Sequence, residues 1–273
     1  MPHTHATLRR RSTTRARGPR VRWPGATVEV GPYRVHALST GSGAETVVLL
    51  HGLSGSGRWW ARNLPAFARR YRVAVPDVVG FGRSRGPGRL PDLEGLAAIL
   101  ARWLDTLGPG RVHLVGHSMG GQLAIHLAAG FPDRVGRLVL CDAAGIPRRR
   151  GARELLRFAR GVAPPSRWGD PRFLPVIVGD ALTAGPRSIL RALAHIVRDD
   201  VRPLLPRIQA PTLVLWGAND TVVPLEHGRE MRRSIPGARL LVLPHAAHNP
   251  MVDRPAAFNR AVLRFLRGGV VGE

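Results

Sequence analysis

Lysine is absent from this chain. All 41 basic residues among the 273 are arginine, and with 18 acidic residues they give a formal net charge of +23. Such a bias is typical of a GC-rich genome, and the arginines are dispersed rather than gathered in a nucleic-acid-binding motif. Aromatic residues make up only 5% of the chain. The composition therefore predicts no specific nucleic-acid partner, although non-specific binding to polyanions at low salt is expected.

Cysteine, long apolar runs and cofactor motifs are equally scarce. The single cysteine, Cys141, excludes an intrachain disulfide and lies in an apolar stretch, where a buried inert thiol is expected. No apolar run has the length of a membrane span, and the basic N-terminus lacks the apolar segment of a signal peptide. No HExxH spacing, phosphate loop or dinucleotide fingerprint occurs. We therefore expect a cytoplasmic protein without transmembrane segment, metal or cofactor, either monomer or homodimer.

The chain divides into four parts. Residues 1–22 carry seven arginines and no acid, which predicts a basic disordered tail. In residues 23–145 apolar strand-like runs alternate with helical patterns, the first of them a helix expected near 58–69, and this alternation predicts a parallel sheet. Residues 146–205 contain no convincing strand but two amphipathic helical stretches, 153–162 and 186–198, joined by a Pro/Gly-rich linker, and we expect a small helical cap there. Strand patterns resume in residues 206–273, the second part of the core.

A G-x-S-x-G motif at residues 116–120 is the most informative stretch. An apolar strand-like run, 111–115, precedes it, and an alanine-rich helical stretch, 122–129, follows. A sharp strand-to-helix turn exposes the serine hydroxyl, and the glycines are needed because neighbouring backbones come too close for a Cβ. We therefore expect Ser118 to be a nucleophile.

A serine nucleophile needs a histidine base and an acid that orients it. Asp220 follows the strand-like residues 213–217, and His248 follows the strand-like residues 240–243. Serine, acid and histidine in this chain order are typical of the same fold as the motif. Asp142, at the end of an earlier strand, is the alternative acid, and His245 is the alternative base. His117, inside the motif, is expected to be a packing or hydrogen-bonding residue.

An oxyanion hole is also predicted. The buried-type strand 46–50 leads into the glycine-containing turn 51–55, which can aim the Leu53 N–H at a substrate carbonyl oxygen. The Met119 N–H, next to the nucleophile, would be the second donor.

These motifs resemble those of the α/β-hydrolase superfamily, and the resemblance covers residues 28–267. The matching stretches, in family order, are residues 51–52, 60–65, 76–84, 116–121, 214–220 and 246–250. The resemblance implies an α/β-hydrolase fold, with a mostly parallel eight-stranded sheet, helices on both faces and a small helical cap. It also implies a serine esterase or lipase-like Ser-Asp-His triad of Ser118, Asp220 and His248. Ala247 and Asp253 depart from the residues common in the family, and neither departure removes a catalytic group.

The activity implied is that of a cofactor-independent hydrolase that cleaves short- to medium-chain carboxylic esters through an acyl-enzyme. Apolar cap residues are the candidates for substrate binding: Leu155, Phe158, Trp168 and Phe173. Carbon–carbon bond hydrolysis of ring-cleavage products, or lactone hydrolysis, is an alternative on the same triad. A non-catalytic binding protein on the same fold is a further alternative, and the intact triad disfavours it.

Overall fold

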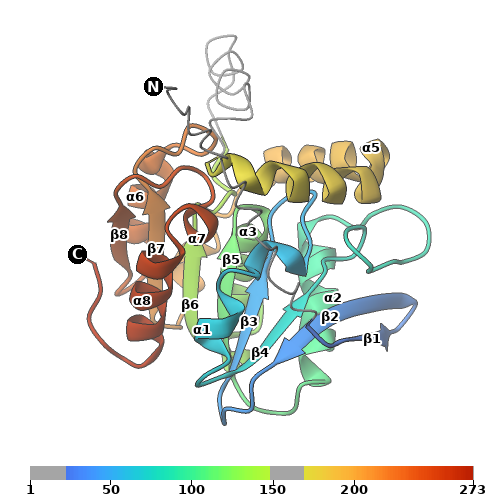
Figure 1. Cartoon of the computed structure of the whole chain (residues 1–273), viewed down its shortest axis with the longest axis horizontal. Coiled ribbons are helices and arrows are strands. Elements are labelled where there is room, and N and C mark those ends of the chain that lie inside the picture. Colours follow the sequence, from blue (N-terminus) through green and yellow to red (C-terminus); the bar gives the residue numbers. More distant parts are fainter. Residues whose placement is uncertain (1–22, 148–168, 273) are drawn as a thin grey trace, which may run out of the picture.

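An eight-stranded sheet forms the centre of the protein (Figure 1). The structure, a computed structural model, describes residues 23–147 and 169–272, so the predicted disordered tail at 1–22 lies outside the described residues. The strands are β1 (Gly25–Val30), β2 (Tyr33–Thr40), β3 (Thr46–Leu50), β4 (Arg72–Pro76), β5 (Val112–His117), β6 (Val135–Cys141), β7 (Thr212–Gly217) and β8 (Arg239–Leu243). Their order is β1-β2-β4-β3-β5-β6-β7-β8. Strand β2 is antiparallel to both of its neighbours, and the other pairs are parallel.

Both faces of the sheet are buried, which explains the continuous apolar runs of its central strands. Successive side chains of a strand point to opposite faces. In β3, Val48 and Leu50 belong to one core cluster, whereas Val47 and Leu49 belong to the other. Strands β5, β6 and β7 divide their side chains between the same two clusters. The sheet therefore needs helices on each side, as parallel sheets generally do.

Helices cover both faces. Helices α2 (Leu93–Asp105), α3 (Met119–Gly130) and α6 (Leu225–Ser234) pack on one face, and α1 (Leu64–Phe67) and α8 (Pro255–Leu266) on the other (Figure 1). The remaining helical elements are η1 (Gly57–Trp60), η2 (Pro132–Arg134), η4 (Pro171–Phe173), α5 (Leu174–Arg198), η5 (Leu205–Arg207) and α7 (Pro250–Asp253). This arrangement confirms the predicted fold class, and the boundaries of the predicted cap at 146 and 205 stay a prediction.

Two helix predictions need correction. The single helix expected near 58–69 is two short pieces, η1 and α1, and Pro65 stands at the start of the second. Proline lacks the N–H that a helix interior requires, so it starts a helix more readily than it continues one. The cap helix expected at 186–198 begins already at Leu174.

Helix α5 reverses direction at Gly185, and we call residues 174–198 the cap hairpin. Gly185 has φ 76° and ψ 156°, which no helical residue adopts. Figure 1 shows the chain running out along one arm and returning along the other, across one edge of the sheet. By length and composition alone, residues 171–198 are apolar enough to cross a membrane, contrary to the sequence-based expectation. The reversal leaves two arms of roughly 16 and 20 Å, each shorter than a hydrocarbon core of about 30 Å.

Candidate active site

Ser118 occupies a strained turn between β5 and α3. Its φ of 52° and ψ of −116° lie outside the regions that serine normally adopts. Neighbouring backbone holds it there, because the Ser118 N–H donates to the Cys141 carbonyl and the Ser118 carbonyl accepts from the Ala144 N–H. The strain places the hydroxyl at the carboxyl edge of the sheet, where catalytic groups of open α/β sheets gather.

The flanking glycines allow the strand and helix to touch. A Cβ on Gly116 would lie 2.3 Å from the Gly120 carbonyl oxygen, and a Cβ on Gly120 would lie 2.4 Å from the Leu50 carbonyl oxygen. Carbon and oxygen atoms cannot approach so closely without displacing backbone. These two glycines therefore bring β3, β5 and α3 together at the turn, as the motif predicts.

His248 links Ser118 to Asp220. Its Nε2 lies 3.2 Å from the Ser118 Oγ, and its Nδ1 lies 2.9 Å from Oδ2 of Asp220. With Asp220 ionised, the proton of the neutral imidazole belongs on Nδ1, and Nε2 is left to accept from the serine hydroxyl. The predicted alternative base, His245, is instead exposed. The structure thus brings together the three residues that the sequence singled out.

The loop after β7 fixes Asp220. Its Oδ1 accepts the N–H groups of Val222 and Val223 at 2.7 and 3.0 Å. Burial alone raises the pKa of Asp220, but the His248 imidazole and these hydrogen bonds outweigh burial and hold the pKa below its ordinary value. Asp220 is therefore the ionised acid of the group.

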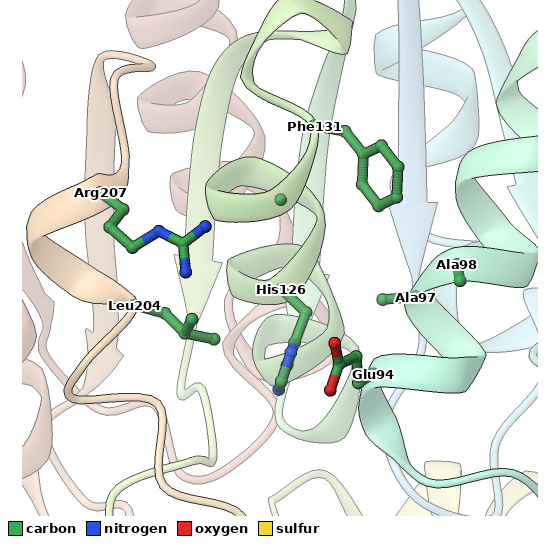
Figure 2. Close-up of a pocket in the computed structure, with 8 residues that line it drawn as sticks. Glu94, Ala97, Ala98, His126, Phe131, Leu204 and Arg207 are labelled. Carbon is green, nitrogen blue, oxygen red and sulfur yellow. The ribbon is translucent and has the colours of Figure 1, made fainter.

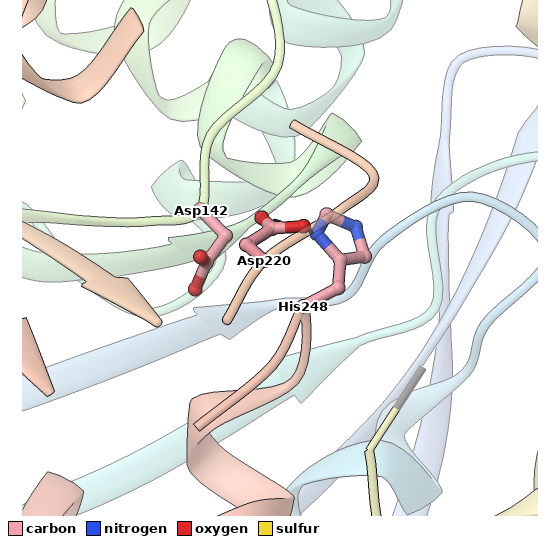
Figure 3. Close-up of side chains that lie close together, drawn as sticks. All are labelled: Asp142, Asp220 and His248. Carbon is pink, nitrogen blue, oxygen red and sulfur yellow. Dashed lines mark hydrogen bonds and ion pairs between the residues drawn. The ribbon is translucent and has the colours of Figure 1, made fainter. Parts of the chain in front are cut away.

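The alternative acid, Asp142, lies behind Asp220 and not against His248. One carboxyl oxygen of Asp142 accepts the Gly217 N–H at 2.9 Å, and its carboxyl is hydrogen bonded to that of Asp220. Figure 3 shows Asp142 on the far side of Asp220 from His248. Asp142, Asp220 and His248 each offer an oxygen or nitrogen atom of a kind that can bind a cation, and these atoms lie within 4.8 Å of one another. Spacing along the chain could not indicate this grouping, because the residues come from three distant loops.

His117, expected to be a packing or hydrogen-bonding residue, supports the base from behind. Its Nε2–H donates to the His248 carbonyl oxygen at 2.7 Å, and the two ring centroids lie 4.9 Å apart. Burial and the neighbouring His248 lower the pKa of His117 to about 3. His117 is therefore neutral and adds no charge beside the base.

The turn predicted to form the oxyanion hole lies beside the nucleophile. A Cβ on Gly52 would lie 3.2 Å from the Ser118 Cβ, so this turn and the serine are in contact. His51 braces the turn, since its Nε2 accepts the Val78 N–H and its Nδ1–H donates to the Gly52 carbonyl. Leu53 follows directly, and Met119 opens α3 next to the serine. We therefore propose the backbone N–H groups of Leu53 and Met119 as the oxyanion donors.

Sequence reasoning missed Asp180, which attaches the cap hairpin to the core. Its side chain is buried and accepts from the Ser56 hydroxyl at 2.9 Å and the Trp59 indole N–H at 3.0 Å. The Arg58 guanidinium also pairs with it. The sequence did carry a signal for this role, since Asp180 is the one acid on a helix of apolar and basic residues. If such a carboxylate is buried, it needs hydrogen-bond donors from another part of the chain.

Of the predicted substrate-binding residues, only Phe173 is described. It is buried and contacts Trp59 edge-on, with ring centroids 5.5 Å apart. Trp59 in turn contacts His117 at 5.8 Å. Phe173 thus connects the start of the cap to the triad. The other three candidates, Leu155, Phe158 and Trp168, lie outside the described residues.

A surface groove of about 490 Å³ lies away from the triad, between α2, α3 and η5 (Figure 2). Glu94, His126, Phe131 and Arg207 are among its lining residues. His126 bonds Asp199, just after the cap hairpin, at 2.9 Å. The groove therefore borders the second attachment of the cap, and it contains no triad residue.

Comparison with known proteins gives consistent similarities. A family model described as the alpha/beta hydrolase family matches residues 47–261. Over 267 residues the chain is 36% identical to a 2-hydroxy-6-oxononadienedioate/2-hydroxy-6-oxononatrienedioate hydrolase of Burkholderia vietnamiensis, covering 86% of this chain and 91% of that protein. An enol-lactonase from Burkholderia xenovorans has a similar structure, with a TM-score of 0.75, 27% identity and coverage of 89% and 100%. A thermophilic esterase from Thermogutta terrifontis gives a TM-score of 0.76, 28% identity and coverage of 91% and 99%.

Proposed function

This chain belongs to the α/β-hydrolase family and is a hydrolase, and from that premise we propose that it cleaves carboxylic esters by serine catalysis. Ser118 is the nucleophile, His248 the general base and Asp220 the acid that orients it. The observation that carries the proposal is the hydrogen-bonded series from the Ser118 Oγ through the His248 imidazole to the Asp220 carboxylate. A hydroxyl beside a neutral, oriented imidazole is an activated nucleophile.

In the first half-reaction the Ser118 Oγ attacks the ester carbonyl carbon, and its proton passes to Nε2 of His248. The negative charge that develops on the carbonyl oxygen is stabilised by the N–H groups of Leu53 and Met119. The imidazolium, held by ionised Asp220, then protonates the leaving alcohol as the carbon–oxygen bond breaks. The products of this step are the free alcohol and an acyl group on Ser118.

In the second half-reaction water replaces the alcohol. His248 removes a proton from the water molecule, the resulting nucleophile attacks the acyl carbonyl, and the imidazolium returns a proton to the Ser118 Oγ. The carboxylic acid leaves, and the enzyme is regenerated. Each step uses only side chains and backbone N–H groups of this chain, so the proposal includes no cofactor. Short to medium acyl chains are the proposed substrates, since the cap is small and partly apolar.

Carbon–carbon bond hydrolysis is the second candidate, and the 36% identical relative named above supports it. A 32% identical relative from Burkholderia cepacia is named a 2-hydroxy-6-oxo-6-phenylhexa-2,4-dienoate hydrolase. The same serine can attack a ketone carbonyl, but the leaving group is then a carbanion that must be protonated at carbon. Asn249 follows the base in this chain, where such enzymes often carry an aromatic residue. The enol-lactonase supports lactone cleavage as a variant of ester cleavage.

The decisive experiment combines a covalent probe with two substrate series. Wild type and Ser118→Ala are treated with a fluorophosphonate and weighed intact, and turnover is measured on nitrophenyl esters of increasing chain length and on a 2-hydroxy-6-oxo-dienoate. Stoichiometric labelling that Ser118→Ala abolishes, with ester turnover, supports the proposal. Labelling with turnover of the dienoate alone replaces ester cleavage by the second candidate. A folded wild type that neither labels nor turns over any substrate would overturn the serine mechanism.

A further inference from the structure

Exposed apolar side chains are concentrated on the cap hairpin. Six large hydrophobic residues are exposed in the described part of the chain, and four of them are Val178, Leu182, Leu190 and Val197. Between 48% and 79% of the surface of each is accessible. Isolated exposed leucines are common, but a group of them on one element marks a site of interaction.

These four side chains share the outer face of the hairpin. At 100° per residue, Val178 and Leu182 lie on the side of the first arm opposite Ile177 and Asp180, which are buried against the core. On the second arm, Leu190 and Val197 lie opposite buried Ala192. Both arms therefore turn these four apolar side chains outward, away from the sheet.

The charges of this outer face have one sign. Arg187, Arg191 and Arg198 are exposed on the second arm, flanking its apolar positions. Asp180 is the only acid within residues 174–198, and it is buried in its bonds to the core. The outer face of the hairpin is thus apolar and cationic without any exposed acid.

The charge of the outer face also indicates which kind of partner can bind to it. Residues 148–168, next to the hairpin in sequence, contain seven arginines and one glutamate, and a second copy of the chain carries +23. Either would bring positive charge against positive charge. An occupant that is anionic at its surface and apolar within satisfies both features of the face. We propose that the outer face of the cap hairpin binds the surface of an anionic phospholipid bilayer, with the two arms lying in the plane of the interface.

The geometry supports lying on the bilayer and not crossing it. Each arm is too short to span, as shown above, and Asp180 holds the hairpin to the core. The hairpin lies across the edge of the sheet where β5 meets α3 (Figure 1), and Ser118 stands between these two elements. Binding would therefore bring the triad edge of the protein toward the lipid. The proposal concerns binding alone and does not depend on the proposed ester hydrolysis.

The test is flotation of the full-length protein with vesicles of equal parts phosphatidylglycerol and phosphatidylcholine, beside vesicles of phosphatidylcholine alone. The Leu182→Ser/Leu190→Ser variant is compared with Phe131→Ser/Val270→Ser, which removes the other two exposed hydrophobics without changing charge. We expect wild type to float with the anionic vesicles and the cap variant to bind at least about tenfold more weakly, because it lacks the two exposed leucines that the bilayer would bury. The control should bind as wild type does.

A charge pair completes the design. Arg187→Ser/Arg191→Ser should weaken binding more than Arg232→Ser/Arg233→Ser, which removes two exposed arginines from α6. Equal binding by all four variants would show non-specific attraction of the +23 chain and overturn the proposal. A wild-type dimer that the leucine substitutions dissociate, without any vesicle binding, would assign the face to a second copy. Labelling of Ser118 by the fluorophosphonate is measured on the same samples. Because labelling reports on the serine nucleophile and flotation on lipid binding, failure of one proposal can be distinguished from failure of the other.

Discussion

The carboxyl of Asp142 is hydrogen bonded to the carboxyl of Asp220, on the far side of Asp220 from His248 (Figure 3). Two carboxylates at hydrogen-bonding distance cannot both be ionised, so one proton is held between them. Burial first, and then Asp220, raises the pKa of Asp142 well above its ordinary value, whereas the His248 imidazole keeps Asp220 ionised. Asp142 is therefore the protonated partner, and it donates to the acid of the triad.

Substitution at Asp142 tests this assignment. Asp142→Asn retains an N–H donor for Asp220 and an acceptor for the Gly217 N–H, so we expect the pH dependence of Ser118 labelling to match that of wild type. Asparagine also tolerates the left-handed backbone at this position, where φ is 44°. Asp142→Leu removes the donor, which strengthens the attraction of Asp220 for a protonated His248. As the pH is lowered, the Asp142→Leu variant should therefore lose Ser118 labelling at a higher pH than wild type does.

The opposite shift would contradict the assignment. If Asp142 were ionised, Asp142→Asn would remove a negative charge near His248, and the rate of labelling would persist to lower pH than in wild type. The measurement is the labelling rate against pH, with folding of each variant checked by urea unfolding. Asp142→Leu leaves the Gly217 N–H without a partner, so a loss of about 1–3 kcal/mol in its free energy of unfolding is expected.

His117 should make the protein less stable in mild acid. Its pKa is about 3 in the folded protein and about 6.5 in the unfolded chain, so between these values the unfolded state binds the proton. The stability contribution is complete above pH 6.5 and is lost as the pH falls toward 3. Between pH 7 and pH 5 this histidine lowers the free energy of unfolding by about 2 kcal/mol.

His117→Gln keeps a donor for the His248 carbonyl and does not titrate, so its urea midpoint should depend less on pH. The exposed His245 serves as the matched control, and His245→Gln should retain the wild-type slope. Parallel slopes for His117→Gln and wild type would refute the low pKa of His117.

How far the sequence predicts this molecule depends on whether a signal is local. Local signals predict the turn around Ser118, the strands before Asp220 and His248, and the alternation of strands and helices. The structure brings Ser118, Asp220 and His248 together as expected. The role of His117 depends on a carbonyl from a distant loop, and no spacing along the chain reveals it. The reversal at Gly185 did have a local signal, the Gly-Pro pair, but it read as a linker before a helix.

Loss of the Asp180 carboxylate should loosen the cap. Asp180→Ala leaves the Ser56 hydroxyl and the Trp59 indole N–H without their acceptor and Arg58 without its partner. Because Arg58 is more than half exposed, solvent screens its share, and we expect a loss of about 2 kcal/mol in the free energy of unfolding. Ester turnover should fall as well, since Trp59 packs against His117.

A surface ion pair provides the comparison. Asp200→Ala breaks the ion pair with Arg202, and both of these side chains are accessible to solvent, so it should destabilise the protein much less than Asp180→Ala does. The two variants are compared by urea unfolding and by turnover of one nitrophenyl ester. Equal effects of Asp180→Ala and Asp200→Ala would mean that Asp180 does not hold the cap to the core.

The close approach at Gly120 gives the sharpest structural expectation. A Cβ there would lie 2.4 Å from the Leu50 carbonyl oxygen and 2.6 Å from that of His51, so Gly120→Ala must displace β3 or the turn that follows it. We expect a loss of about 3 kcal/mol or more in the free energy of unfolding, together with slower fluorophosphonate labelling, because the same turn carries the Leu53 N–H. Gly130→Ala, at the other end of α3, meets no atom within 4 Å and should change stability by about 0.5 kcal/mol or less. Urea unfolding and fluorophosphonate labelling rates are measured on both variants. If Gly120→Ala were as stable and as reactive as Gly130→Ala, the turn after β3 could move without loss of stability, and the expectation would be wrong.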